Sequence, residues 1–376
     1  MAGARRLVEL AGFDNPRPGS FIPMLLSVLT TAREAGWDAE MVFDAPAGEP
    51  QAWVAEFESA GFAPRFAPPG NRRELGRWLR GVVAETDAPT VLHTHFTTFD
   101  MPAVLAARGS SAAHVVWHQH MDLTTRPDVM VRNAIKFGGF GRLTDRILCP
   151  APDTAAAVRR VGGPRDRVEF LPNAIDFERF GLADSAAKAA ARDAIGVEGE
   201  EVVLLHFGWD WLRKGGDLYL EAAKALRDRG RGGFFAVTVT DHPDAEPLSE
   251  QLGLGAEARI VPPQPDVQAL YAAADAFVAP SRAEGGTPYA LLEALASGVP
   301  VIASDIAGHR YVAGAVDGCE VYEGGSEGLA AALEVALDSL PLDEAGARAV
   351  RGQAQERFAL PTWSRGIVSQ FDEIAG

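Results

Sequence analysis

The stretch SRAEGGTPYALLEALASGVPVIASDIAG, Ser281 to Gly308, decides how the second half of this chain folds. An apolar run, AFVA at residues 276–279, precedes it, and a second run, VIAS at residues 301–304, lies near its end. Between these runs, Thr287 and Pro288 are typical of a helix start, because Thr accepts from free N–H groups and Pro fits the first helical position. Apolar residues then recur at helical spacing. Two apolar strands with a helix between them predict a parallel βαβ unit.

The segment Glu284 to Thr287 lies at the carboxyl end of the first predicted strand, where open α/β sheets bind ligands. Gly285 and Gly286 let a ligand approach the backbone, and the amino end of the helix favours an anion such as a diphosphate. Glu293 lies about two turns into the helix, where it can meet a sugar hydroxyl beside that anion. An ordinary βαβ unit with a glycine turn and a solvated glutamate is the alternative interpretation.

This stretch resembles the donor-nucleotide signature of the retaining glycosyltransferases of family 4 (group 1), which have the GT-B fold. That family shows Glu-Gly-x-Gly-x-x-x-x-Glu-Ala, with seven residues between the glutamates. Glu284 and Glu293 have eight between them, and the run from Glu293 to Ser304 matches well. The resemblance implies that Glu293 holds the nucleotide ribose and that Glu284 holds the sugar.

Length, charge and cysteine content bound the class of protein. A chain of 376 residues predicts two domains, and a net charge of −16 argues against nucleic acid as the main partner. Cys149 and Cys319 are far apart and read as reduced, buried residues. The amino end has too short an apolar run for a signal peptide, and no run reaches the roughly 18 residues of a membrane span. We therefore expect a cytoplasmic protein.

The chain opens on a βαβ pattern with a turn-rich loop after its first strand, residues 7–11. No G-x-G-x-x-G motif follows that strand, so the dinucleotide fingerprint is excluded there. The resemblance makes Gly19 and Ser20, at the end of the loop, acceptor-side candidates. A plain surface turn is the alternative interpretation for Ser20.

Histidines gather near the ends of two predicted strands, Val91 to His95 and Val115 to His120. The resemblance implies that the terminal histidine of the second strand, His120, faces the donor sugar. We expect His93 and His95 to alternate, so that only one faces the cleft and the other faces a helix layer, and we favour His95 for the cleft. The histidine spacing fits no standard zinc ligand set, so we expect no metal.

A second cluster of signals follows the strand at residues 202–207. A cation at a strand end beside glycines, such as Gly208, neutralises a leaving diphosphate. The family shows Gly-Arg and then Lys-Gly here. Lys214 matches the lysine, but Trp209 stands at the arginine position, which makes Arg213 the candidate for the second charge. The spacing does not fit a P-loop.

Three further stretches resemble the family pattern. Residues 172–176, PNAID, resemble its Pro-Asn-Gly-hydrophobic-Asp segment and close the first domain. Val261, after a later strand, is a base-contact candidate, whereas Tyr311 stands where the family often has glutamate. The segment Val129 to Leu143 reads as a helix packed on the sheet, with an acceptor-side or membrane-surface helix as the alternative.

These signals together predict an α/β protein of GT-B architecture, with two doubly wound Rossmann-like domains facing across a cleft. We place the acceptor-side domain at residues 1–178 with a returning helix at about 357–376, and the donor-binding domain at residues 179–356. The donor-binding candidates are Gly208, Arg213, Lys214, Val261, Glu284, Gly285, Gly286, Thr287 and Glu293. The catalytic candidates are His120, Lys214 and Glu284, and the acceptor-side candidates are Gly19, Ser20 and His95.

The predicted reaction moves a sugar from a nucleoside diphosphate sugar to an unidentified acceptor, with retention and without a cofactor. No Asp-x-Asp pair occurs, so a metal clamp is not indicated. Two other functions stay open. One is a nucleotide-sugar 2-epimerase of the same fold. The other is a non-catalytic sugar-nucleotide-binding protein, which the departures at Trp209 and Tyr311 keep in play.

Overall fold

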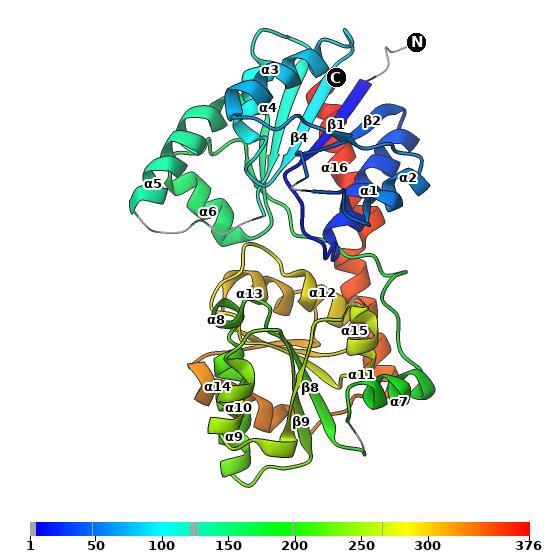
Figure 1. Cartoon of the computed structure of the whole chain (residues 1–376), viewed down its shortest axis with the longest axis vertical. Coiled ribbons are helices and arrows are strands. Elements are labelled where there is room, and N and C mark those ends of the chain that lie inside the picture. The colour runs from blue at the N-terminus through cyan, green and yellow to red at the C-terminus, as the bar shows by residue number, and fades with distance from the viewer. Residues whose placement is uncertain (1–4, 47, 121–122, 124–126, 198, 265) are drawn as a thin grey trace. The chain divides into compact units, whose positions relative to one another are not determined.

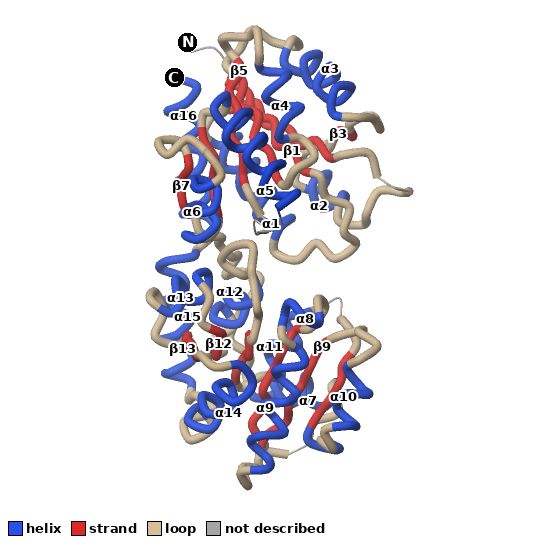
Figure 2. The backbone as a smooth tube through the Cα atoms, turned by 90° about the vertical axis from the view of Figure 1, so that its left-hand side faces the viewer, coloured by secondary structure: helices blue, strands red, loops and turns tan. Residues whose placement is uncertain are grey.

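The computed structural model describes the chain except for residues 1–4, 47, 121–122, 124–126, 198 and 265. The chain divides into two compact units. Unit 1 comprises Met1–Asp176 with Leu360–Gly376, and unit 2 comprises Phe177–Ala359. In both, helices flank a sheet, as the coloured ribbon and the tube show (Figures 1 and 2).

Unit 1 contains a seven-stranded parallel sheet in the order β3-β2-β1-β4-β5-β6-β7. Its strands are β1 (Arg5–Ala11), β2 (Trp37–Phe43), β3 (Arg65–Phe66), β4 (Thr90–His95), β5 (Ala113–His118), β6 (Arg146–Cys149) and β7 (Val168–Phe170). Its helices are α1 (Phe21–Glu34), α2 (Val54–Ser59), α3 (Arg72–Val83), α4 (Asp100–Ala107), α5 (Pro127–Asn133), α6 (Pro152–Arg160) and α16 (Leu360–Ala375). A π-helical segment, Ala134–Gly139, and a 3-10 helix, Phe140–Leu143, follow α5.

The sheet of unit 1 is buried on both faces, as a parallel sheet requires. Alternate residues of β1 pack on opposite layers: Leu7 joins the core under α1 and α16, and Val8 joins the core under α3. Helix α16 comes from the end of the chain and buries Trp363, Ile367 and Phe371 at helical spacing. The red ribbon of α16 lies beside α1 in Figure 1.

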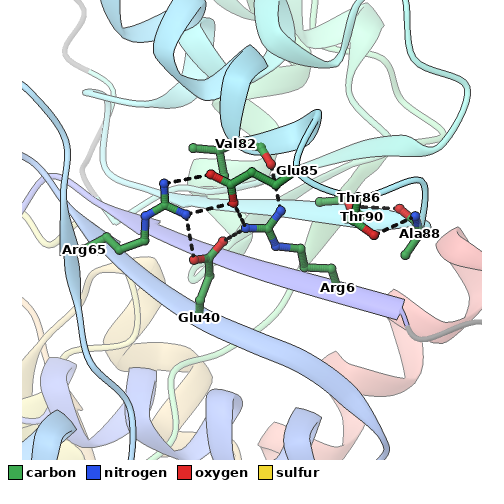
Figure 3. A network of polar contacts seen from close by, with 8 residues as sticks. All are labelled: Arg6, Glu40, Arg65, Val82, Glu85, Thr86, Ala88 and Thr90. Carbon is green, nitrogen blue, oxygen red and sulfur yellow. Dashed lines mark hydrogen bonds and ion pairs between the residues drawn. The ribbon is translucent and has the colours of Figure 1, made fainter.

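An ion-pair network links the neighbouring strands β1, β2 and β3 of this sheet (Figure 3). Arg6 at the start of β1 pairs with Glu40 of β2 and with Glu85, whose Oε2 lies 2.7 Å from the Arg6 Nη2. Arg65 of β3 contacts both carboxylates as well, with 3.0 Å between its Nη1 and the Glu85 Oε2. Arg6 also donates to the Val82 carbonyl, so its buried guanidinium is fully compensated.

Unit 2 contains a six-stranded parallel sheet in the order β10-β9-β8-β11-β12-β13. Its strands are β8 (Val202–Phe207), β9 (Phe234–Val239), β10 (Ala258–Val261), β11 (Ala276–Ala279), β12 (Val301–Ser304) and β13 (Cys319–Tyr322). Its helices are α7 (Ser185–Ala194), α8 (Trp211–Lys214), α9 (Gly216–Asp228), α10 (Ala245–Gln251), α11 (Val267–Ala273), α12 (Tyr289–Ala296), α13 (Ala307–Ala313), α14 (Gly325–Ala336) and α15 (Glu344–Phe358), with a 3-10 helix at Gly255–Glu257. The strand order reverses between β8 and β11, and such switch points form crevices at the carboxyl ends of strands.

The predicted α/β class with two Rossmann-like sheets is confirmed, and three local predictions need correction. Helix α12 begins at Tyr289, and Pro288 precedes it in an extended conformation, so Thr287 is not the capping residue. The tail is two helices, because the backbone leaves the helical region at Ala359 between α15 and α16. Residues 129–143 form three short helical segments of different type. Among the described residues, no helix is long and apolar enough to cross a membrane.

Candidate active site

The loop after β8 is pressed against the backbone that follows β11. Gly215 ends the short helix α8 with a φ of +73°, a left-handed conformation that favours glycine. A Cβ atom on Gly215 would lie 2.1 Å from the carbonyl oxygen of Pro280. Glycine is therefore required for this approach, which carries Lys214 to the segment that follows β11.

Two cations converge on one carboxylate at this point. The Lys214 Nζ lies 2.6 Å from the Glu284 Oε1, and the Arg213 Nη1 lies 3.1 Å from the Glu284 Oε2. The Ser281 hydroxyl also donates to the Glu284 Oε1, at 2.6 Å. The structure thus brings together Lys214, Arg213 and Glu284, which the sequence predicted from two motifs some 70 residues apart.

Burial shapes the charge of this cluster. Desolvation raises the pKa of Glu284, but the charge of Lys214 and hydrogen bonds from Lys214 and Ser281 outweigh it and lower that pKa overall. Glu284 is therefore ionised at neutral pH and neutralises only part of the two facing positive charges. Arg213 also pairs with Asp210, at 2.6 Å, on the exposed side. The two cations thus face two carboxylates, one from Glu284 and one from Asp210, at the carboxyl ends of β8 and β11.

A small pocket adjoins the cluster and is mainly apolar. Its lining includes His206, Phe207, Trp209, Phe277, Ala290 and Leu291, beside Lys214 and Glu284. Trp209, at the position of the family arginine, is 39% exposed, and its ring packs on Phe207. The second positive charge at Glu284 comes instead from Arg213.

The glycine segment before α12 is held by the start of α13. A Cβ atom on Gly308 would lie 2.4 Å from the carbonyl oxygen of Gly286, so glycine is required there as well. Gly286 and Thr287 are buried beneath this contact. On α12, Glu293 is buried and its Oε2 accepts a hydrogen bond from the Tyr271 hydroxyl, at 2.9 Å.

Gly208 and Val261 lie at the ends of β8 and β10, two strands apart in the sheet. The Gly208 N–H donates to the Val239 carbonyl, and the Val261 carbonyl accepts from the Thr240 N–H, both at 2.9 Å. Both residues are thus fixed by the sheet at its carboxyl edge.

A cluster of histidines forms around a buried glutamate in unit 1. The Glu9 carboxylate lies 2.9 Å from the His93 Nδ1 and 2.8 Å from the His95 Nε2. The His95 Nδ1 lies 2.9 Å from the His120 Nε2. The prediction that only one of His93 and His95 faces each side was wrong: residues two apart in a strand share a face, and both side chains contact Glu9.

Burial determines the charges in this cluster. Desolvation raises the pKa of Glu9, but the two histidines outweigh it and lower that pKa to about 2. Desolvation lowers the pKa of His95 to about 4 and the pKa values of His118 and His120 well below 6.5. Glu9 is therefore an anion, and these three rings are neutral at neutral pH.

Three of these rings could together approach a metal ion. In the described part of the chain, His93, His95 and His118 form a fully buried group whose possible ligand atoms lie within 4.8 Å of one another. Glu9 already occupies one nitrogen of His93 and one of His95. Tetrahedral zinc needs nitrogens about 2.1 Å from the ion, so the rings would have to draw together to bind it.

The acceptor-side candidates Gly19 and Ser20 lie directly before α1 in unit 1. Gly19 has a φ of +54°, and Ser20 is buried, with its carbonyl accepting from the Met24 N–H. The next residue, Phe21, contacts the His120 ring edge-on, with 5.3 Å between ring centroids. The loop and the histidine cluster therefore meet at Phe21.

Two contributors to these clusters were missed from the sequence. Glu9 interrupts the otherwise apolar run Leu7 to Ala11, which is a signal for a buried, partnered carboxylate. Ser281 carried no such signal, because its contact with Glu284 depends on how the loop between them turns.

Two family models match the chain. "Glycosyltransferase Family 4" matches residues 24–179, and "Glycosyl transferases group 1" matches residues 201–339. The chain belongs to the family 4 (group 1) glycosyltransferases. The second match contains the Lys214 and Glu284 cluster, and the first contains the histidines at the ends of β4 and β5.

Curated relatives agree with this family. The chain is 31% identical over 211 residues to the lipopolysaccharide glucosyltransferase WaaG of Escherichia coli, covering 54% of this chain and 56% of WaaG. It is 30% identical over 169 residues to a D-inositol 3-phosphate glycosyltransferase of Nocardia farcinica, covering 42% of this chain and 37% of that protein. These matches span between about a third and just over half of the relatives' length.

Solved structures share the fold of the whole chain. Anabaena HepE, solved in complex with UDP and glucose, matches with a TM-score of 0.79 at 18% identity, covering 98% of this chain and all of HepE. The structure of WaaG matches with a TM-score of 0.69 at 20% identity, covering 96% of this chain and 99% of WaaG. Both units therefore follow the GT-B architecture of glycosyltransferases.

Proposed function

We propose that this family member transfers a glycosyl group from a nucleoside diphosphate sugar to an acceptor hydroxyl, with retention at the anomeric carbon. The observation that carries the proposal is the convergence of Lys214 and Arg213 on Glu284 at the carboxyl ends of β8 and β11. Two cations held beside a glycine segment suit a diphosphate. HepE, which shares the fold, is solved with UDP, so UDP is the first nucleotide to test.

We assign the roles in unit 2 from this geometry. The diphosphate takes the place of the Glu284 carboxylate on Lys214 and Arg213, which frees Glu284 to bind a sugar hydroxyl. The N–H groups around Gly286 and Thr287 support the same anion. Glu293, oriented by the Tyr271 hydroxyl, accepts from the ribose.

The transfer step needs no protein nucleophile in this proposal. The bond from the anomeric carbon to the diphosphate oxygen breaks, and its electron pair leaves with the diphosphate. The acceptor oxygen bonds to the same face of that carbon, and its proton passes to a departing phosphate oxygen. Lys214 and Arg213 stabilise the charge that develops on the diphosphate. His120 contributes a hydrogen bond to the reacting sugar, as the family resemblance implies, and no metal ion takes part.

The test is thermal shift against UDP, GDP, ADP and dTDP and their sugars, with Mg²⁺ and with EDTA, followed by product analysis. We expect one nucleotide to raise the melting temperature equally with and without Mg²⁺, because a ligand that binds only the native state stabilises it. NMR of the anomeric proton, with water or a simple alcohol as acceptor, then reports retention or inversion. The absence of any shift and of any sugar release would contradict the proposal.

The same assay separates the alternatives. An epimerase converts the sugar nucleotide into its epimer without releasing UDP. A binding protein raises the melting temperature but releases no UDP beyond the uncatalysed rate. A transferase releases UDP together with free or transferred sugar.

A further inference from the structure

A hydrogen-bonded line runs from the core of unit 1 to the end of β5. It begins at Glu9 of β1, passes through His95 of β4 and ends at His120, just after β5. The Glu9 and His95 side chains are fully buried. Strand register explains the first contact, because Glu9 of β1 lies beside His93 of β4, two residues before His95 on the same face. His95 in turn lies beside His118, the last residue of β5.

The chemistry of the groups fixes where each proton lies. An ionised carboxylate only accepts hydrogen bonds, so the His95 Nε2 donates to Glu9. A neutral imidazole carries one N–H, so the His95 Nδ1 has a lone pair and accepts from the His120 Nε2. By the same rule, the Nδ1 of neutral His120 has a lone pair. None of the described residues is a hydrogen-bond partner of that atom.

The surroundings hold the His120 ring in place. It stacks on His118, with 4.4 Å between ring centroids, and contacts Phe96 at 4.9 Å. Phe96 has a φ of +64° and is the only described non-glycine residue with positive φ. That conformation is strained for a bulky side chain and is found where the surrounding structure enforces it. A strained residue directly after His95 thus packs against the last ring of the line.

We propose that Glu9 and His95 are positioning residues, which hold His120 in the tautomer whose Nδ1 accepts a hydrogen bond from a substrate hydroxyl. This inference rests on the proposed function, in which His120 contacts the reacting sugar. A carboxylate that fixes an imidazole tautomer is the device of the serine protease triad, extended here by one more imidazole. Its use is to give the substrate hydroxyl a defined acceptor.

The tautomers are measured directly by NMR of the full-length protein with ¹⁵N-labelled histidine. We expect the His95 and His120 signals to show a protonated Nε2 and an unprotonated Nδ1. A protonated Nδ1 on His120 overturns the inference. So does metal bound stoichiometrically to the purified protein, because metal ligation would then set the tautomers.

A substitution at Glu9 tests the effect on the reaction. In Glu9→Gln, the amide accepts from one histidine and donates to the other. If the amide donates to His93, the His93 proton must lie on Nε2, which has no partner among the described residues. If it donates to His95, the His95 proton lies on Nδ1 and is donated to the His120 Nε2. The change therefore passes through His95 and leaves the His120 Nδ1 protonated.

We expect Glu9→Gln to lower kcat for UDP-glucose hydrolysis roughly tenfold, with little change in the dissociation constant of UDP. The loss stays far below the ~10⁴ of the protease triad, because His120 holds a hydroxyl and does not relay the reacting proton. The matched control is Glu40→Gln, on the neighbouring strand β2 and in the Figure 3 network, which should keep wild-type kcat and tautomers.

The readouts separate this inference from the proposed function. If the wild-type protein shows the expected tautomers but hydrolyses no sugar nucleotide, the proposed function is wrong, and the role of the His120 Nδ1 as acceptor for a sugar hydroxyl is overturned with it. If the wild type is active and Glu9→Gln has the same kcat although its His120 tautomer has changed, only the positioning role is overturned. If the Glu9→Gln variant fails to fold, the histidine tautomers of the wild-type protein decide: a protonated Nε2 on both His95 and His120 supports the inference, and a protonated Nδ1 on His120 overturns it.

Discussion

The Lys214 ammonium and the Glu284 carboxylate form a direct ion pair, with 2.6 Å between Nζ and Oε1, across 70 residues of sequence. Both side chains are nearly buried, with 14% and 8% of their surfaces exposed. Such a pair is sensitive to the loss of either partner, because the remaining charge stays buried and uncompensated. In the proposed reaction a diphosphate that displaces the Glu284 carboxylate keeps the Lys214 ammonium compensated.

Lys214→Ala should lower kcat/KM for the preferred sugar nucleotide by about 3 kcal/mol, or roughly a hundredfold, as expected for losing one preorganised donor. Steady-state kinetics of UDP release measures the effect. The control is Lys224→Ala on α9, a half-exposed lysine that pairs with Asp228, which should leave the kinetics unchanged. Wild-type turnover in Lys214→Ala would remove Lys214 from the mechanism.

Glu293→Gln should weaken UDP binding by roughly 1.5 to 3 kcal/mol, because a charged acceptor for the ribose is lost while the side-chain volume is kept. Isothermal titration calorimetry with UDP measures this change. Glu250→Gln, at an exposed position of α10, serves as the control and should bind UDP normally. Equal UDP affinity in both variants would show that Glu293 serves the packing of Tyr271 and not the ligand.

Gly215→Ala should destabilise unit 2 and reduce nucleotide binding, because its Cβ would lie 2.1 Å from the Pro280 carbonyl oxygen. Gly230→Ala is the matched control: Gly230 has a similar φ of +78° but nothing within 4 Å of the added atom. In the control, the free energy of unfolding should fall by about 1 to 2 kcal/mol, from the strain of a left-handed alanine. In Gly215→Ala it should fall clearly more. If calorimetry showed the same fall in melting temperature for both variants, the close approach of Gly215 to Pro280 would be refuted.

The free energy of unfolding should fall as the pH drops from 6.5 towards 4. The pKa of His95 is about 4 in the folded protein and 6.5 ordinarily, so between these values the unfolded chain binds the extra proton. The difference corresponds to roughly 3 kcal/mol for His95. His206 and His309, whose pKa values burial also lowers to about 4, act in the same direction.

Below pH 4.5 the pKa of Glu9, near 2, adds a further loss of stability of the same sign. Urea unfolding at a series of pH values measures the slope. His95→Gln removes one titrating group and should flatten the curve between pH 6.5 and 4. A variant curve parallel to the wild-type curve would show that His95 does not titrate as the buried contacts require.

The predictions that came closest were those based on local patterns. The apolar runs before Pro280 and around Ile302, with a helical repeat between them, gave β11, α12 and β12 within a residue or two. Burial on both faces gives parallel strands a nearly continuous apolar sequence, which is easy to recognise. The helix start failed by one residue because Pro288 adopts an extended conformation that the residue types alone do not determine.

The sequence by itself determined the α/β class, the two sheets and the segments that carry charge at the carboxyl ends of their strands. Only the tertiary structure decided which side chains meet. The contact between Arg213 and Glu284 depends on how closely two loops approach at Gly215, and the line from Glu9 to His120 depends on strand register. Local propensity acts over a few residues, whereas these contacts arise from packing between segments some 70 to 90 residues apart.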